Sequence, residues 1–317
     1  MHYWKGLDSV PADMAPTVVT IGNFDGVHLG HCEVLDSAVT QAKKHSAKSV
    51  AISFDPHPAQ VHRPGSAPEL IMGIEDRVDT LASVGLDATL MIHYTLEFAD
   101  QSAEEFVRSI IVEKLNAVAV VVGHDVRFGK DNSGDFDYMC ELGTRYGFEV
   151  IGVQDVGDKR RLSSTWVREE LAAGNVEAAA AILGRPHRMR GEVVHGAARG
   201  RELGFPTANL APDAAGIIPA DGVYAGWVID EAGVRWPAAI SVGSNPTFEG
   251  VSRVVESHVI DRPEEGFEDF DLYGQQIVVE FTAHLRPMVA YRGIEALVEQ
   301  MNDDVVQARS VLATESH

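Results

Sequence analysis

A glycine-rich segment that carries two histidines, GNFDGVHLGH at residues 22–31, stands between a strand pattern and a helix pattern. Residues 17–22 form a short run rich in β-branched side chains, and apolar residues recur at helical spacing between Val34 and Ala42. Unpaired N–H groups and the positive end of the dipole at a helix N-terminus suit a phosphate group. The segment therefore predicts an α/β domain with a phosphate site where its first strand ends.

The two imidazoles of this segment are the first catalytic candidates. His28 and His31 can donate hydrogen bonds to phosphoryl oxygens while charge shifts in a transition state, and the glycines let the backbone approach a ligand. A single histidine or a single glycine-rich turn is more often structural, so the prediction depends on the H-x-G-H spacing at this position. The phosphate-binding residues predicted in the segment are Gly22, Asn23, Phe24 and Gly30.

The length and charge of the chain limit the classes of protein that it can be. With 317 residues it is long enough for two domains of ordinary size. The net charge of −21 leaves no basic footprint for nucleic acid, and no apolar run is long enough to span a membrane. The first residues lack the pattern of a signal peptide, and two cysteines provide neither a disulfide framework nor a metal quartet. We therefore expect a cytoplasmic protein with small-molecule substrates and no nucleic-acid or membrane partner.

Strand patterns alternate with helix patterns through the first half of the chain. The clearest helix pattern is 102–115, where Ser102 and Glu105 form a capping-box signature. Such alternation predicts a parallel, doubly wound sheet whose ligands bind beyond the carboxyl ends of the strands. The predicted strands are 17–22, 48–54, 88–93, 117–122 and 148–153, and the segments 22–31, 54–58 and 123–129 follow the first, second and fourth of them.

Candidate ligand contacts follow the second and fourth predicted strands. In FDPHP, residues 54–58, two prolines hold His57 in an extended and exposed pose, although proline-rich turns are also common in ordinary loops. In GHDVRFG, residues 123–129, Asp125 can hydrogen-bond the edge of a ligand. Phe128 can stack on a ring, or it can serve as a core residue of the turn.

A second phosphate motif is predicted in RLSSTWVREEL, residues 161–171, which opens a helix with Ser163 or Ser164 as its N-cap. Ser164 and Thr165 offer hydroxyl groups, and Arg168 lies one turn further on, where it can fork onto phosphate oxygens. Taken alone, the string also fits an ordinary capped helix whose arginine pairs with a glutamate.

The pattern changes at 184–188, where an alanine-rich helix gives way to short strands separated by Gly, Pro and Asp. Short strands at this spacing predict a small barrel or sandwich. The last 25 residues read as one helix with an apolar face. The predicted strands are 189–194, 223–229, 236–242, 254–260 and 276–285.

The string RGRELGFPTANL, residues 199–210, is the chemical centre of the second half. Thr207 and Asn209 alternate on an extended segment, and their hydroxyl and amide oxygens are ligands that suit Mg²⁺. A lone T-x-N pair more commonly forms a side-chain turn. Glu256 shares a strand face with Val254, so its carboxylate is either partly buried and functional or at a sheet edge.

These motifs together resemble a known family. The decamer at 22–31 resembles the signature of the nucleotidyltransferase superfamily, and its GxFDGVHxGH form is similar to the adenylyltransferase module of bacterial bifunctional riboflavin kinase/FAD synthetases. FDPHP, a G-x-[N/D]-x-x-FG element and SSTxxRE follow in that family's order, although many members have an aromatic residue in place of Val126. GFPTAN, NPTF, the glutamate of an ExH string and DLYG resemble the riboflavin kinase module, with Ser257 where the family often has threonine.

The resemblance covers nearly the whole chain and carries implications for fold, activity and site. It implies a Rossmann-like nucleotidyltransferase domain with a parallel sheet over residues 1–186, and a mostly β riboflavin kinase barrel with a C-terminal helix over 187–317. The implied enzyme phosphorylates riboflavin to FMN with ATP, then adenylylates FMN to FAD with release of pyrophosphate, using Mg²⁺ or another divalent cation. The implied roles are flavin binding for His57, Pro58, His62, Asp125 and Phe128; ATP or phosphate binding for Arg161, Ser164, Thr165, Arg168, Gly204 and Pro206; metal binding for Thr207 and Asn209; and proton acceptance for Glu256.

Two other functions compete with this interpretation. The chain can be a monofunctional FMN adenylyltransferase with an inactive C-terminal module, although GFPTAN and Glu256 are intact. It can also be a flavin-binding sensor, which predicts degenerate phosphate motifs, whereas HxGH and SSTxxRE are both present. The sequence leaves both a monomer and a homo-oligomer open.

Overall fold

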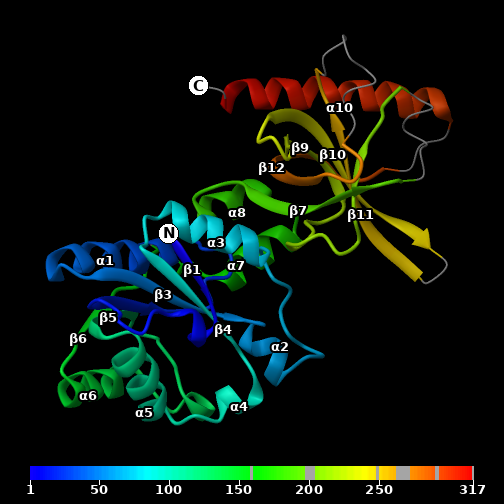
Figure 1. The fold of residues 1–317 in the computed structure, drawn as a ribbon. Helices are drawn as coiled ribbons and strands as arrows, with labels where there is room; N and C mark the ends of the chain where they lie inside the picture. The colour runs from blue at the N-terminus through cyan, green and yellow to red at the C-terminus, as the bar shows by residue number, and fades with distance from the viewer. Residues whose placement is uncertain (158–159, 197–203, 248–249, 262–271, 290–292, 316–317) are drawn as a thin grey trace. The chain divides into compact units, whose positions relative to one another are not determined.

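The computed structural model describes residues 1–157, 160–196, 204–247, 250–261, 272–289 and 293–315. The chain forms two compact units, each with its own sheet (Figure 1). The first, here called the α/β unit, comprises Met1–Glu69 and Ile74–Ser163. The second, here called the barrel unit, comprises Leu70–Gly73 and Ser164–His317. The boundary between the two catalytic modules at 186/187 stays a prediction.

The α/β unit is built on a six-stranded parallel sheet in the order β1-β4-β3-β2-β5-β6. This confirms the predicted parallel sheet and its five strands. The sequence patterns did not predict β1, which pairs with β4 at one edge. The strands are β1 (His2–Lys5), β2 (Thr17–Ile21), β3 (Lys48–Asp55), β4 (Ala88–His93), β5 (Ala117–Gly123) and β6 (Glu149–Val153).

Helices cover both faces of this sheet. Neighbouring residues of a strand point to opposite sides, so each strand contributes apolar side chains to both layers of helices. On β2, Val18 packs with Ala38 of α1, whereas Val19 packs in the larger cluster with Ile110 and Leu142. Figure 1 shows α1 lying along the sheet. The helices are α1 (Leu29–His45), α2 (Pro58–His62), α3 (Ile74–Ser83), α4 (Leu96–Ala99), α5 (Ala103–Phe106) with the π-helix η2 (Val107–Lys114), and α6 (Phe136–Tyr146), besides the 3-10 turns η1 (Leu7–Ser9) and η3 (Lys130–Asn132).

The strand order reverses at β2, which lies between β3 and β5. From β2 the chain adds β3 and then β4 on one side, and later β5 and β6 on the other. In open α/β sheets ligands bind in the crevice at such a switch point, outside the carboxyl ends of the strands. The loop 22–31 leaves β2 at this end and enters α1 directly.

The barrel unit contains a closed six-stranded barrel in the order β10-β11-β8-β7-β12-β9, with antiparallel pairs. The barrel interior follows strand alternation, as on β11, where Val255, Ser257 and Val259 are buried. This confirms a barrel. The strands are β7 (His187–Val194), β8 (Ala208–Leu210), β9 (Gly222–Ile229), β10 (Arg235–Thr247), β11 (Gly250–Val259) and β12 (Gln276–Arg286).

Among the residues that the structure describes, the helices of the barrel unit are α7 (Ser164–Ala172), α8 (Val176–Leu183) and α10 (Ile294–Glu315). The predicted C-terminal helix is confirmed by α10, which buries Ala308 and Leu312 against Ala225 and Ile260 of the barrel. Within the part of the chain that the structure describes, no helix is both long and apolar enough to cross a membrane.

Candidate functional sites

The two histidines of the loop after β2 lie against each other at the start of α1. His28 is the N-cap residue of α1, and its Nδ1 accepts a hydrogen bond from the backbone N–H of His31 at 3.2 Å. The two rings stack with centroids 3.7 Å apart and an interplanar angle of 20°. The loop therefore places both imidazoles beside the N–H groups of the first helical turn, where an anion is favoured.

The backbone of this loop takes unusual conformations. Phe24 has φ 49° and Val27 has φ 38°, a region that residues with a Cβ atom rarely adopt and that a β-branched residue avoids. Both side chains are buried, and the Phe24 ring meets His31 edge-on at 5.3 Å between centroids. Residues held in such conformations concentrate at ligand sites, because the surrounding structure must stabilise them. The buried Phe24 ring thus packs against the His31 imidazole.

At the end of β3, the predicted flavin residues sit beside a row of aromatic rings, of which the sequence motifs had indicated only Phe128. His57 is the N-cap of α2: its Nδ1 accepts from the N–H of Ala59 at 3.1 Å, and its own N–H donates to Gln60 Oε1 at 3.1 Å. Pro58 is the first residue of that helix, and His62 Nε2 lies 2.9 Å from the hydroxyl of Tyr94.

Tyr94 follows β4 directly, and its ring is 5.6 Å from both Phe54 and Phe98. The row continues from Phe98 to Phe106 and on to Phe128, each step 6.2 Å between centroids. Burial raises the pKa of the Tyr94 phenol above its ordinary value. Its place at the carboxyl end of a parallel strand was a signal for Tyr94 that the sequence offered.

At the end of β5, two predicted ligand contacts bind each other. Arg161 donates to Asp125 Oδ2 at 2.5 Å and to Asp155 Oδ1 at 3.1 Å. Asp125 and Arg161 are both exposed. The Phe128 side chain is 6% exposed and packs in the core. This agrees with the second of its two predicted roles, a core residue of the turn.

The barrel unit gathers a threonine, an asparagine and a glutamate between β8 and β11. Glu256 pairs in register with Asn209. The Thr207 hydroxyl donates to Glu256 Oε2 at 3.3 Å, and the Asn209 amide nitrogen donates to Thr207 Oγ1 at 3.2 Å. These three side chains offer a hydroxyl, an amide oxygen and a carboxylate, which is the all-oxygen donor set that Mg²⁺ prefers.

Neighbouring residues fix this cluster in place. Nδ1 of His258 donates to the carbonyl of Pro206 at 3.0 Å, and its ring meets Phe205 at 5.2 Å between centroids. Gly204 turns the chain with φ 87° before this contact. A Cβ atom on Gly196 would lie 2.5 Å from Asn209 Oδ1, so only glycine allows this approach to the Asn209 amide.

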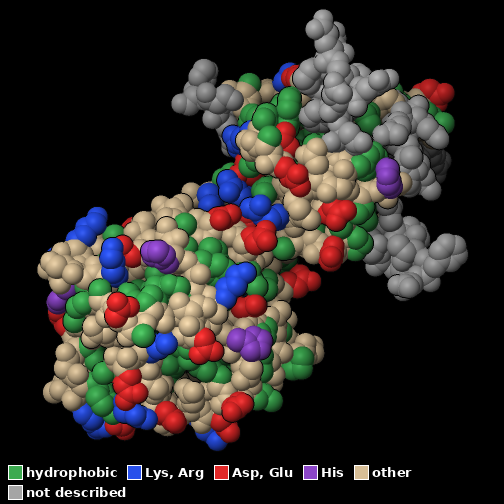
Figure 2. All heavy atoms as spheres, viewed as in Figure 1, with side chains coloured by type: hydrophobic (Ala, Val, Ile, Leu, Met, Phe, Trp, Pro, Cys, Tyr) green, Lys and Arg blue, Asp and Glu red, His purple; other side chains and the backbone are tan. Residues whose placement is uncertain are grey.

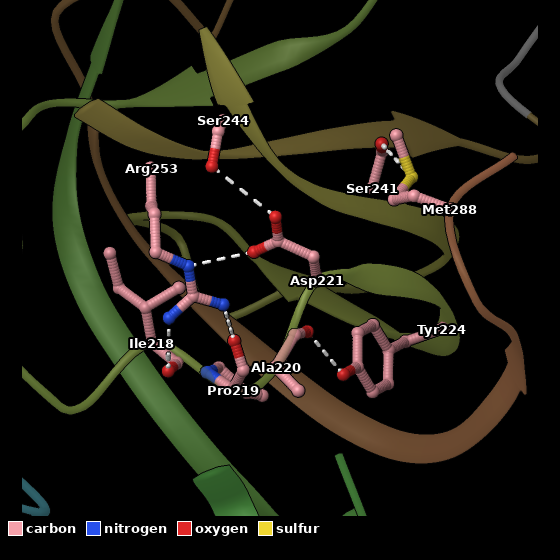
Figure 3. Close-up of polar contacts among 9 residues, drawn as sticks. All are labelled: Ile218, Pro219, Ala220, Asp221, Tyr224, Ser241, Ser244, Arg253 and Met288. Carbon is pink, nitrogen blue, oxygen red and sulfur yellow. Dashed lines mark hydrogen bonds and ion pairs between the residues drawn. The ribbon is translucent and has the colours of Figure 1, made fainter. Parts of the chain in front are cut away.

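An arginine on β11 clamps the segment that leads into β9. Figure 3 shows Arg253 reaching from β11 to residues 218–221. Its guanidinium donates to Asp221 Oδ1 at 2.8 Å, to the carbonyl of Ile218 at 3.1 Å and to the carbonyl of Pro219. Ser244, which pairs in register with Arg253, donates to the other oxygen of Asp221 at 3.3 Å. Arg253 lies three residues before Glu256, and its contacts with residues 218–221 were not predicted from the sequence.

The second predicted phosphate motif forms the start of α7. Ser164 and Thr165 are its first two residues, Thr165 is exposed, and Arg168 lies one turn further on. Val167 and Leu171 form the buried face of the helix. The motif therefore belongs to the barrel unit, whereas Arg161 belongs to the α/β unit.

Comparisons with known proteins agree with the motifs. Residues 10–166 match the FAD synthetase family model, and residues 183–312 match the riboflavin kinase family model. A bifunctional riboflavin kinase/FMN adenylyltransferase from Pseudomonas fluorescens is 35% identical over 100% of both chains. This chain belongs to the same family. A protein of the same name from Escherichia coli K12 is 33% identical over 92% of this chain and 91% of its own.

Family membership confirms the resemblance found in the motifs: the chain is a riboflavin kinase and an FMN adenylyltransferase. The fold agrees with a solved structure as well. A structure described as a macrolide-efflux protein from Streptococcus pneumoniae has a TM-score of 0.86 and 30% identity, over 98% of this chain and 99% of that one.

Proposed function

We propose that the barrel unit phosphorylates riboflavin and that the α/β unit, together with the SSTxxRE motif, adenylylates the FMN so formed. The observation that carries this division of labour is the cluster of Thr207, Asn209 and Glu256 in one unit, with the stacked pair of His28 and His31 in the other. Each cluster has the chemistry of one half-reaction, and each lies in the family match of the corresponding activity.

In the kinase step, Glu256 accepts the proton of the riboflavin 5′-hydroxyl while that oxygen attacks the γ-phosphorus of ATP. The bond between the γ-phosphorus and the bridging oxygen breaks, and ADP leaves. Thr207 orients the Glu256 carboxylate through its hydrogen bond. The loop with Gly204 and Pro206 holds the phosphates of this ATP.

Mg²⁺ fits the donor set of Thr207, Asn209 and Glu256, because hydroxyl, amide and carboxylate oxygens are its usual protein ligands. We propose that Thr207 and Asn209 hold it. When bound, Mg²⁺ neutralises charge on the ATP phosphates. A net charge of −21 repels polyanionic substrates, and such a counter-charge reduces this repulsion.

In the adenylyl step, an FMN phosphate oxygen attacks the α-phosphorus of a second ATP, and the bond to the β-phosphate oxygen breaks with release of pyrophosphate. His28 and His31 donate hydrogen bonds to the oxygens where negative charge develops. Ser164, Thr165, Arg168 and Arg161 hold the leaving pyrophosphate. The wall at His57, Pro58 and His62 holds the flavin ring, with Asp125 at its edge. No protein nucleophile is needed, since FMN supplies the attacking oxygen.

The setting that fits these activities is the cytoplasm, in agreement with two free cysteines and substrates of central metabolism. On the face that Figure 2 shows, acidic and basic side chains are interspersed over the α/β unit. The net charge of −21 favours small-molecule substrates over a nucleic acid as partners. Both a monomer and a homo-oligomer are compatible with the assignment.

One experiment tests the assignment directly. The purified chain is incubated with riboflavin, ATP and Mg²⁺, and the flavins are separated by chromatography over time. FMN that rises and then gives way to FAD supports both steps. A second incubation supplies FMN in place of riboflavin. FAD formed only in this second incubation would point to an inactive barrel, and unchanged flavins in both would point to a sensor.

A further inference from the structure

Arg77 of α3 is a buried charge that none of the sequence motifs contains. Its side chain is 1% exposed. Nη1 donates to the carbonyl of Phe54 at 3.2 Å and approaches Ser53 Oγ at 3.5 Å. Both partners lie at the carboxyl end of β3, where FDPHP begins. The guanidinium thus contacts the carboxyl end of β3, where ligands bind in open α/β sheets.

The same contacts extend to the loop that carries the two histidines. Ser53 Oγ donates to the carbonyl of Asn23 at 3.0 Å, and the N–H of Gly22 donates to the carbonyl of Ile52 at 3.1 Å. Ser53 is therefore a bridge between Arg77 and the start of the 22–31 loop. Through it, one guanidinium contacts β3 and supports the loop after β2.

The charges around Arg77 come from the same two segments. Burial lowers the pKa of the Arg77 guanidinium, and the carboxylates of Asp25 and Asp55 oppose this effect. Asp25 is itself buried, at 2% exposed, within the histidine loop. Asp55 is the last residue of β3, within FDPHP. Because a buried charge without a compensating partner is costly, the positions of the three groups depend on one another.

We propose that Arg77 is a positioning residue for adenylyl transfer. It holds the 22–31 loop and the FDPHP segment in a fixed position relative to each other at the switch point of the sheet. The guanidinium touches no substrate. It acts through Phe54, Ser53 and Asp25 to keep the imidazole pair and the flavin wall at a fixed spacing. The proposal rests on the assignment of adenylyl transfer to this unit.

The test uses the full-length chain with Arg77→Lys and Arg77→Met, and with Ser83→Ala on the exposed end of the same helix as control. Lysine keeps the charge but loses the planar fork, whereas methionine keeps much of the volume and leaves Asp25 and Asp55 uncompensated. Four quantities are measured: kcat and KM for FMN adenylylation, riboflavin kinase activity, thermal unfolding, and the Kd for FMN from flavin fluorescence.

For Arg77→Lys we expect kcat of adenylylation to fall about 10-fold and the Kd for FMN to rise, with kinase activity and melting temperature close to wild type. Arg77→Met should lose more of both kcat and FMN affinity, and Ser83→Ala should keep both. Wild-type kcat and FMN affinity in both arginine variants would overturn the proposal. So would losses that only follow the unfolded fraction, with unchanged KM and Kd in the folded protein. A wild-type chain that neither adenylylates nor binds FMN would overturn the functional assignment instead.

Discussion

The hydroxyl of Thr207 lies 3.3 Å from Glu256 Oε2, across the junction of β8 and β11. The two residues come from separate motifs, GFPTAN and VVESHVI, that the barrel brings together. Since the hydroxyl donates to the carboxylate, Thr207 fixes one Glu256 oxygen, and the other can accept a proton. The pair therefore joins a candidate metal ligand to a candidate base within one hydrogen bond.

Replacing Glu256 should separate the two activities of the chain. Glu256→Gln keeps an acceptor for Thr207 but removes the basic carboxylate, so riboflavin phosphorylation should fall by about 10²–10⁴-fold. FMN adenylylation should stay at the wild-type rate, and Glu256→Ala should give the same pattern. The measurement follows FMN formed from riboflavin and FAD formed from added FMN. Glu192→Gln, an exposed carboxylate on β7, is the control; loss of both activities in Glu256→Gln would refute the division between the units.

Replacing His28 should have the opposite effect, provided that its capping role is kept. The Nδ1 atom of His28 caps α1, and asparagine is an equally good N-cap, so His28→Asn removes the imidazole and preserves the helix start. We expect adenylylation to fall about 10²-fold or more while riboflavin kinase activity is unchanged. His45→Asn, at the other end of α1, is the control. An unimpaired rate of FAD formation in His28→Asn would remove this histidine from the mechanism.

The elements that the sequence predicted correctly have local signals. The parallel strands of the α/β unit are short apolar runs, and Ser102 does cap the helix that begins at Ala103, with its side chain accepting from the N–H of Glu105. The loop at 22–31 was also found from local information, since a glycine-rich turn between a strand and a helix requires no knowledge of the remaining chain.

The features that the sequence did not predict depend on residues far apart in the chain. Strand β1 joins the sheet only because β4, 86 residues away, offers an edge, as in the pair of His2 and Ala88. In the sequence, Arg77 resembles an ordinary polar residue of a helix, and only the fold brings it to the carbonyl of Phe54 at the end of β3. Arg253 likewise gains its role only when the segment at Ile218 reaches the hairpin of β10 and β11. Register and long-range contact decide these roles, and periodicity does not report them.

The buried phenol of Tyr224 should make the barrel unit sensitive to alkaline pH. Tyr224 donates to the carbonyl of Ala220 at 2.5 Å, as Figure 3 shows, and burial raises its pKa to about 12. The unfolded phenol loses its proton near pH 10, so the unfolded state binds fewer protons between pH 10 and about 12. The stabilisation is complete below pH 10 and is lost as the pH rises through this window.

Thermal unfolding measured from pH 8 to 12 tests this sign. The wild-type melting temperature should fall through the window, and the slope should be smaller in Tyr224→Phe. At pH 8 the variant should melt a few degrees lower, because about 1 kcal/mol of hydrogen-bond stabilisation is lost. Identical slopes in the two proteins would show that Tyr224 ionises as freely in the folded state as in the unfolded one.

A methyl group at residue 196 should disturb the kinase site without straining the backbone. Gly196 does not use the left-handed region, yet the Cβ of an alanine would come within 2.6 Å of Cγ and Nδ2 of Asn209 as well as 2.5 Å of its Oδ1. The Asn209 side chain must then move, and its hydrogen bond to Thr207 must lengthen or break. We expect Gly196→Ala to require a several-fold higher Mg²⁺ concentration for half-maximal riboflavin phosphorylation, measured from initial rates at fixed ATP.

Gly243→Ala on β10, whose Cβ would meet only the flexible end of Met288 at 3.3 Å, is the control and should behave as wild type. An unchanged Mg²⁺ requirement in Gly196→Ala would separate Asn209 from the metal, since the displaced amide would then have no effect on it.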